Sequence, residues 1–120
     1  MQKIIVVSVS PSHARNVTVW LRTDYLVLHL ATVKQLEVEM AAGKPDLVLM
    51  DVSLPKKNGF EACREIRTNE RFRRIPVILC LEPDRETDKF WAQRQGASGT
   101  LVKPLKMEDL LSIIKHNLPP

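Results

Sequence analysis

Five short apolar segments, each followed by a stretch with helical periodicity, run along this chain of 120 residues. Apolar runs without polar interruption are typical of parallel strands that are buried on both faces of a sheet. We expect strands at 3–7, 25–31, 46–51, 75–81 and 100–102. Because strand–helix–strand units cross over in a right-handed sense, these units predict an α/β fold in three layers, with a doubly wound parallel five-stranded sheet between two layers of helices.

Capping residues indicate where the intervening helices begin. Ser10 precedes a proline, and Thr32 is followed three residues later by a glutamine, which predicts a capping box. Asn58 and Asp84 are expected to cap the third and fourth helices, and a fifth amphipathic helix is expected at 107–118. The apolar faces of the first three helices are Ala14, Val17 and Leu21; Val33, Leu36 and Met40; and Phe60, Cys63 and Ile66.

Length and hydropathy narrow the class of protein. The chain has the length of a single domain, which we expect to span 1–120. No apolar run is long enough to cross a bilayer, and no charged leader precedes one, so we expect a cytoplasmic protein without membrane contact. Cys63 and Cys80 show no metal-ligand spacing and are expected to be small buried residues.

Charge and glycine usage exclude several functions. A net charge of +4 is too small to demand nucleic acid as a partner. The basic residues near the end of the third helix are expected to form a solvated face, and without a helix-turn-helix pattern we expect no specific DNA binding. These residues are Arg64, Arg67, Arg71, Arg73 and Arg74. The four glycines form no phosphate-binding loop, and no G-x-S-x-G elbow of a hydrolase is present.

Two charged residues stand at the ends of apolar strands. Asp51 closes the third apolar run, and Lys103, which is followed by a proline, closes the fifth. Ligand chemistry in open α/β sheets lies at the carboxyl ends of the strands, so we expect these two side chains to come together there. A carboxylate that accepts a phosphoryl group needs a nearby cation, and a lysine supplies one.

Three stretches resemble the receiver domain of two-component response regulators: DLVLMDVSLPKKNGFEACREIR at 46–67, IPVILC at 75–80 and RQGASGTLVKPL at 94–105. The resemblance implies a flavodoxin-like (βα)5 fold and a role in phosphorelay signal transduction, without an enzyme activity of its own. It puts Asp51 at the phosphoacceptor position and Lys103 at the phosphoryl-binding position. The implied partners are a sensor histidine kinase, a phosphotransfer protein or a downstream signalling protein, and receivers often form homodimers through their fourth and fifth units. The segment at 87–97 is similar to stand-alone regulators of twitching or phototactic motility.

Other positions depart from the family pattern. Receivers carry two adjacent carboxylates after the first strand, where they hold Mg²⁺, but Ser8 and Val9 stand there in this chain. Leu81 replaces the hydroxyl residue of the fourth strand, Thr100 replaces the aromatic switch residue of the fifth, and Ser53 offers only its backbone carbonyl. Since Mg²⁺ prefers carboxylates and waters, the sequence predicts a weak Mg²⁺ site at best.

Three functional hypotheses follow. The main one is a degenerate receiver in which Asp51 and Lys103 form a fixed ion pair, Mg²⁺ binds Asp51 weakly if at all, and docking to another protein does not depend on phosphate. Trp91, on the fourth helix, is then the candidate anchor for that partner. A receiver of the same fold in which Asp51 still accepts a phosphoryl group differs from the main hypothesis only at the metal site. The alternative is a flavodoxin-like domain that binds a small molecule or anion at the start of the first helix. The polar residues of that anion site are Ser8, Ser10, Ser12 and His13.

Overall fold

The structure, a computed structural model, describes residues 1–85 and 87–119, which form a five-stranded parallel sheet with the strand order β2-β1-β3-β4-β5. The strands are β1 (Lys3–Val7), β2 (Leu26–Leu30), β3 (Leu47–Asp51), β4 (Val77–Leu81) and β5 (Gly99–Val102). The helices are α1 (Pro11–Leu21), α2 (Val33–Ala42), α3 (Gly59–Thr68), α4 (Thr87–Arg94) and α5 (Met107–Asn117). The predicted α/β fold with alternating strands and helices is therefore confirmed.

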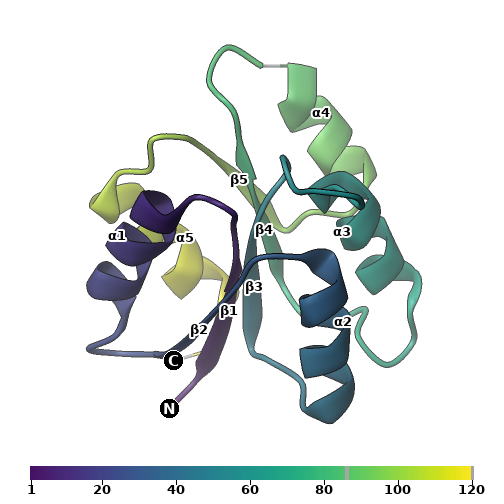
Figure 1. Ribbon diagram of the computed structural model, residues 1–120, viewed down its shortest axis with the longest axis horizontal. Coiled ribbons are helices and arrows are strands. Elements are labelled where there is room, and N and C mark those ends of the chain that lie inside the picture. The colour runs from purple at the N-terminus through teal and green to yellow at the C-terminus, as the bar shows by residue number, and fades with distance from the viewer. Residues whose placement is uncertain (86, 120) are drawn as a thin grey trace.

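The helices cover both faces of the sheet. In Figure 1, α1 and α5 lie on one side, and α2, α3 and α4 lie on the other. Each face has its own apolar core, and the side chains of β1, β3 and β4 alternate between the two cores. The chain leaves β1 toward β2 at one edge and returns through β3 on the other side of β1. This reversal of strand order creates a crevice at the carboxyl ends of β1 and β3.

The burial of each strand follows from its place in the sheet. Every residue of β3 and β4 is buried, in agreement with their unbroken apolar sequences. The edge strand β2 is only partly covered, and Leu26 is 55% exposed. Burying a charged carboxylate costs free energy unless the carboxylate has a counter-charge and hydrogen bonds. The groups around Asp51 therefore determine whether the fold can hold it in its charged form.

Side-chain caps start three of the helices as predicted. Ser10 Oγ accepts a hydrogen bond from the backbone of His13, and Asn58 accepts one from the backbone of Glu61. Thr32 and Gln35 form a complete capping box. The predicted cap at Asp84 is wrong, because α4 begins only at Thr87 and Asp84 has a φ of 63°. An N-cap residue needs an extended backbone, whereas a short polar side chain such as that of aspartate tolerates the left-handed turn seen here.

The N-terminus of α3 lies directly against the end of β3. Gly59 donates its backbone N–H to the carbonyl of Val52 at 3.0 Å. A Cβ atom at this position would lie 2.9 Å from the Cα of Val52 and would collide with the backbone carbonyl of Asp51. Glycine is therefore the residue that lets α3 approach the functional end of β3.

One arginine of the basic group is structural rather than solvated. Arg67 donates from Nε to the carbonyl of Gly96 at 2.9 Å and from Nη1 to the carbonyl of Ile75 at 3.2 Å. The expectation of a uniformly solvated basic face is wrong for this residue, since it links α3 to the segments that lead into β4 and β5. Throughout residues 1–85 and 87–119, none of the helices has the combination of length and hydropathy needed to span a membrane.

Candidate functional site

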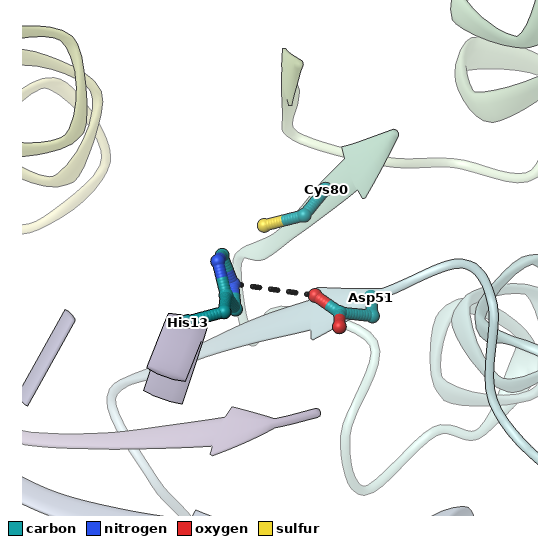
Figure 2. A group of neighbouring side chains, drawn as sticks. All are labelled: His13, Asp51 and Cys80. Atoms are coloured by element: carbon teal, nitrogen blue, oxygen red, sulfur yellow. Dashed lines mark ion pairs between the residues drawn. The ribbon is translucent and has the colours of Figure 1, made fainter. Parts of the chain in front are cut away.

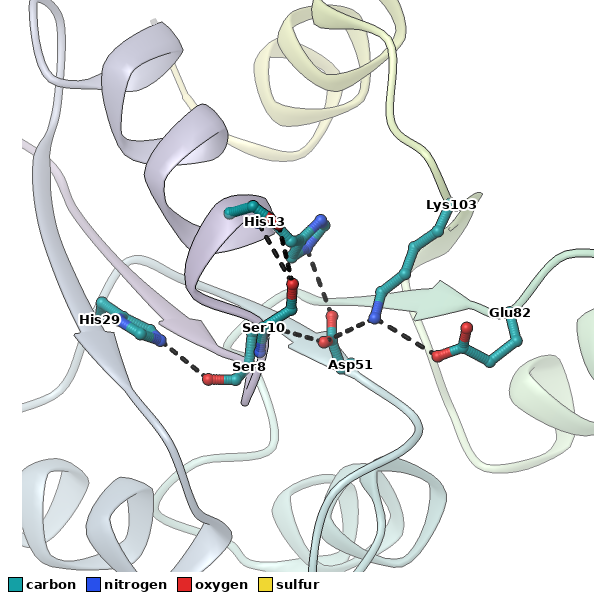
Figure 3. A network of polar contacts seen from close by, with 8 residues as sticks. Ser8, Ser10, His13, His29, Asp51, Glu82 and Lys103 are labelled. Carbon is teal, nitrogen blue, oxygen red and sulfur yellow. Dashed lines mark hydrogen bonds and ion pairs between the residues drawn. The ribbon is translucent and has the colours of Figure 1, made fainter.

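Asp51 lies at the carboxyl end of β3 at the bottom of the site, and its side chain is only 2% exposed. One carboxylate oxygen, Oδ2, accepts hydrogen bonds from the hydroxyl of Ser8 and from Nζ of Lys103, both at 2.7 Å (Figure 3). The structure thus brings together the aspartate and the lysine that end two separate strands. The same oxygen binds the serine that follows β1.

Ser8 is held rigidly in the crevice between β1 and β3. The residue is completely buried, and its hydroxyl also accepts a hydrogen bond from the backbone of Ser10 at 3.1 Å. Its backbone carbonyl lies 2.8 Å from Nε2 of His29 on the edge strand (Figure 3). The serine therefore has a fixed rotamer and directs its hydroxyl proton toward Asp51.

The other carboxylate oxygen, Oδ1, faces His13 from the first turn of α1. His13 Nε2 lies 3.4 Å from this oxygen as an ion pair if the imidazole is protonated, and among residues 1–85 and 87–119 neither of these two buried atoms has a hydrogen-bond partner. The sequence places His13 at the start of α1 but does not reveal its approach to Asp51. The signal that could have found it is positional, since α1 begins directly after the carboxyl end of β1.

Lys103 also contacts a second carboxylate at the rim of the site. Glu82 Oε1 lies 3.4 Å from Lys103 Nζ, and the glutamate side chain is 41% exposed. The lysine thus bridges a buried carboxylate and a partly solvated one. Sequence alone could not place this glutamate, because it follows the end of β4 in a loop.

Both members of the buried pair remain charged at neutral pH. Burial raises the pKa of Asp51, but its contacts with His13, Lys103 and Ser8 outweigh that effect and hold the pKa below its ordinary value of 3.8. Burial lowers the pKa of Lys103, but the hydrogen bond and charge of Asp51, together with Glu82, raise it above its ordinary value of 10.5. The pair is therefore an ion pair and not a neutral hydrogen bond.

The remaining predicted residues lie around this centre in different environments. Val9 is 52% exposed, and Ser53 is exposed in the loop after β3. Leu81 is buried in the core beneath α2 and α3, while Thr100 is half-buried on β5. The Ser10 and Ser12 hydroxyls lie 3.3 Å apart within the first turn of α1. Trp91 is 49% exposed on α4.

Comparison with known proteins identifies the family. The profile of the response regulator receiver domain matches residues 4–115. The chain belongs to this family. It is 37% identical over 115 residues to protein PilH of Pseudomonas aeruginosa, and the match covers 95% of each chain. The receiver resemblance and the role in two-component signalling are thereby confirmed.

Solved receiver structures share the whole fold. The receiver domain of a sensor histidine kinase from Pseudomonas aeruginosa PAO1, which was solved with a magnesium ion in its active site cleft, is 30% identical, with a TM-score of 0.86 and coverage of 96% of this chain and 95% of that one. The chemotaxis response regulator CheY4 of Vibrio cholerae is 26% identical, with a TM-score of 0.89 and coverage of 98% and 99%. Receiver domains are signalling modules that bind Mg²⁺ and interact with histidine kinases or phosphotransfer proteins.

Proposed function

We propose that this receiver domain acts mainly by docking to another protein, and that Asp51, at the phosphoacceptor position, forms a fixed ion pair with Lys103 instead of serving as an efficient phosphorylation switch. The observation that carries the proposal is the occupation of Asp51 Oδ2 by Ser8 and Lys103, both at 2.7 Å. A carboxylate that is buried and already bound by two donors is a weak nucleophile until these contacts rearrange.

The donors around Asp51 do not fit a Mg²⁺ ion. Mg²⁺ requires oxygen ligands in near-octahedral geometry and usually takes carboxylates and waters. After β1 this chain offers the Ser8 hydroxyl, which is committed to Asp51, and the apolar side chain of Val9, which is half-exposed. The second carboxylate, Glu82, is bound to Lys103 at the rim. We therefore assign no step of the function to a metal at this position.

Weak metal binding predicts slow phosphotransfer. A divalent cation stabilises developing charge on a transferred phosphoryl group by several kcal/mol, and each ~1.4 kcal/mol corresponds to about a tenfold change in rate. We expect phosphorylation of Asp51 from a small phosphodonor to be slower by about three orders of magnitude than in a receiver with its full set of carboxylates.

The α4–β5 face supports the docking role. On α4 only Ala92 is buried, whereas Phe90 is 64% and Trp91 is 49% exposed. Val102, at the end of the neighbouring β5, is 42% exposed. Exposed aromatic side chains of this kind are typical anchors in protein interfaces. The expected occupant is a histidine kinase, a phosphotransfer protein or a downstream signalling protein, or a second copy of this chain.

Other features of the proposal rest on the family. We assign the whole chain, 1–120, to one receiver domain without catalytic activity of its own and with a cytoplasmic location. The positions of Leu81 and Thr100 support a signal that does not pass through the family's switch, because a buried leucine has no hydroxyl with which to bind a phosphoryl group.

The test is incubation with acetyl phosphate and Mg²⁺, followed by intact mass measurement. We expect no stable adduct on the native chain, and the Asp51→Asn variant is the control for modification elsewhere. Replacing Ser8 and Val9 together by aspartate restores the carboxylate pair and should produce a phosphorylated species that depends on Asp51. Rapid and stable Asp51-dependent phosphorylation of the native chain would overturn the proposal.

A further inference from the structure

The pocket of Asp51 contains two other side chains that are typical ligands of a different class of metal. His13, Asp51 and Cys80 each direct one ligand atom to a common point, and these three atoms all lie within 4.8 Å of one another (Figure 2). Asp51 and Cys80 are direct register partners on β3 and β4, so their side chains point to the same face of the sheet. His13 approaches from α1 above that face.

We propose that this cluster binds a zinc ion, with His13 Nε2, Asp51 Oδ1 and Cys80 Sγ as ligands. Imidazole nitrogen, carboxylate oxygen and thiolate sulfur are the three ligand types that Zn²⁺ takes in proteins, and a thiolate excludes Mg²⁺ as the preferred ion. The inference concerns the same carboxylate as the proposed function but does not depend on whether Asp51 can be phosphorylated.

The distances agree with a tetrahedral site. With metal–ligand bonds of about 2.1 Å, a nitrogen and an oxygen ligand of a tetrahedral ion lie about 3.4 Å apart. His13 Nε2 and Asp51 Oδ1 are separated by 3.4 Å. The longer bond to sulfur requires about 3.6 Å between Sγ and the other two atoms. Since Sγ lies within 4.8 Å of both, closing the site needs a movement of the Cys80 side chain of at most about 1.2 Å.

The two atoms nearest to the proposed ion lie 3.4 Å from each other, and in the part of the chain that the structure describes neither takes part in a hydrogen bond. Among the described residues, His13 Nε2 and Asp51 Oδ1 belong to the few buried side-chain atoms without a hydrogen bond, although the Asp51 side chain is 2% exposed and that of His13 is 11% exposed. Leaving buried polar atoms unpaired costs about 1–3 kcal/mol each. A metal ion that binds both atoms removes that cost, which gives the cluster a reason to hold an ion.

The second oxygen of Asp51 makes the hydrogen bonds that hold a metal-binding carboxylate in a fixed orientation. Oδ2 is fixed by Ser8 and Lys103, so the carboxylate can bind an ion through Oδ1 alone while its orientation is held from behind. The charges also balance, because the carboxylate and the thiolate neutralise Zn²⁺ while Glu82 neutralises Lys103. Because burial raises the pKa of the Cys80 thiol, the thiol is protonated without the ion, and formation of the Zn–S bond must release that proton to solvent.

A cleft borders the cluster on its His13 side. It has a volume of about 280 Å³ and is lined by residues that include His13, Trp20, Glu82, Lys103 and Leu105. A water molecule from this cleft can occupy the fourth position of a tetrahedral ion bound by three protein ligands.

Cobalt substitution gives a readout that reports the sulfur ligand directly. We expect one Co²⁺ to bind the reduced protein with a thiolate-to-cobalt charge-transfer band in the near ultraviolet, and Zn²⁺ to remove that band by competition. Cys80→Ala and His13→Gln should each weaken binding more than about 100-fold, since even outer-shell losses cost 10–100-fold. Ser8→Ala, which removes only outer support, should weaken it about 10-fold.

Cys63 provides the matched control. It is also free and completely buried, but it lies on α3 in the other apolar core. Cys63→Ala should leave the cobalt spectrum unchanged, and circular dichroism of every variant checks that the fold is retained. A native protein without the band, or a band that survives in folded Cys80→Ala or His13→Gln, would overturn the zinc site. Because these outcomes do not involve acetyl phosphate, they are independent of the outcome for the proposed function.

Discussion

The centre of the site and the α4–β5 face use their side chains in opposite ways. Around Asp51, charged and polar groups are buried and bind one another, with two donors on one oxygen at 2.7 Å. On α4, large aromatic side chains are exposed, and only Ala92 is buried. The first region has strong interactions that are internal to the chain, and the second leaves large apolar side chains exposed, with Arg94 stacked over the Phe90 ring at 5.6 Å. Under the proposed function, recognition depends on the α4–β5 face, and the ion pair at the centre contributes mainly to stability.

The largest expected effect comes from removing Lys103, the partly buried cation that pairs with Asp51. Lys103→Met leaves Asp51 buried without its main counter-charge, and breaking a buried pair costs about 3–5 kcal/mol. The Ser8 hydrogen bond to Asp51 and the partial solvation of the lysine should limit this loss. We therefore expect Lys103→Met to lower the free energy of unfolding by about 2–4 kcal/mol. Urea unfolding measures the loss as a lower midpoint with an unchanged slope.

The control for this prediction removes both charges. The double variant Asp51→Asn, Lys103→Met should recover most of the lost stability, because no uncompensated charge is left in the interior. The exposed Lys44→Met should change stability by less than about 0.5 kcal/mol. Equal losses in the free energy of unfolding for Lys103→Met and Lys44→Met would show that the Asp51–Lys103 pair does not stabilise the fold.

The approach of α3 to the centre gives the next largest effect. Gly59→Ala puts a Cβ atom against the backbone of Asp51 and Val52, and such overpacking costs about 1–3 kcal/mol. Gly43→Ala is the matched control, because it has no atom within 4 Å of the added Cβ and an extended φ of −176°. Thermal unfolding of the two variants should therefore separate them clearly, and similar melting temperatures would contradict the close contact.

Sequence patterns predicted the parts of the fold that depend on local rules. The unbroken apolar runs placed β3 and β4, and Thr32 with Gln35 formed the predicted capping box. The cap at Asp84 failed because the loop after β4 adopts a left-handed turn that its composition does not specify. Arg67 was misjudged because its carbonyl partners come from other segments of the chain.

The centre of the site was only partly predictable for the same reason. Asp51 and Lys103 could be paired because each ends a strand, and strand ends meet at one edge of a parallel sheet. The approach of His13 and Cys80 could not be read from spacing, since three residues at positions 13, 51 and 80 form no sequence motif. Only the strand order and the register between β3 and β4 bring these side chains together.

The pH dependence of stability separates the centre from the rest of the molecule. Because the pKa of Asp51 is lowered in the folded state, its contribution is present above 3.8 and is lost as the pH falls through the lower folded value. Because the pKa of Lys103 is raised, its contribution is present below 10.5 and is lost as the pH rises through the higher folded value. Stability from this pair should thus be constant near neutrality and fall at both extremes.

Unfolding as a function of pH checks this window. The Asp51→Asn, Lys103→Met variant should show a shallower loss of stability below pH 3.8 and above pH 10.5 than the native chain. Identical curves of stability against pH for the two proteins would mean that other carboxylates and lysines cause the loss of stability at low and at high pH.

The smallest effect on stability, and the largest on recognition, is expected at the α4–β5 face. Trp91 is 49% exposed, so Trp91→Ala should lower the free energy of unfolding by less than about 1 kcal/mol. Trp20, which packs against the core between α1 and α5, is the matched control, and Trp20→Ala should cost about 1–3 kcal/mol. For partner binding we expect the reverse, with a larger loss of affinity in Trp91→Ala than in Trp20→Ala. Truncation of an aromatic anchor weakens an interface by about 2 kcal/mol or more, which is at least tenfold in Kd.

The binding measurements are sedimentation for self-association and titration with a purified histidine kinase or phosphotransfer protein. A Trp91→Ala variant that binds as tightly as the native chain would place recognition elsewhere, and the contrast between a self-contained centre and an open face would then no longer explain how the domain signals.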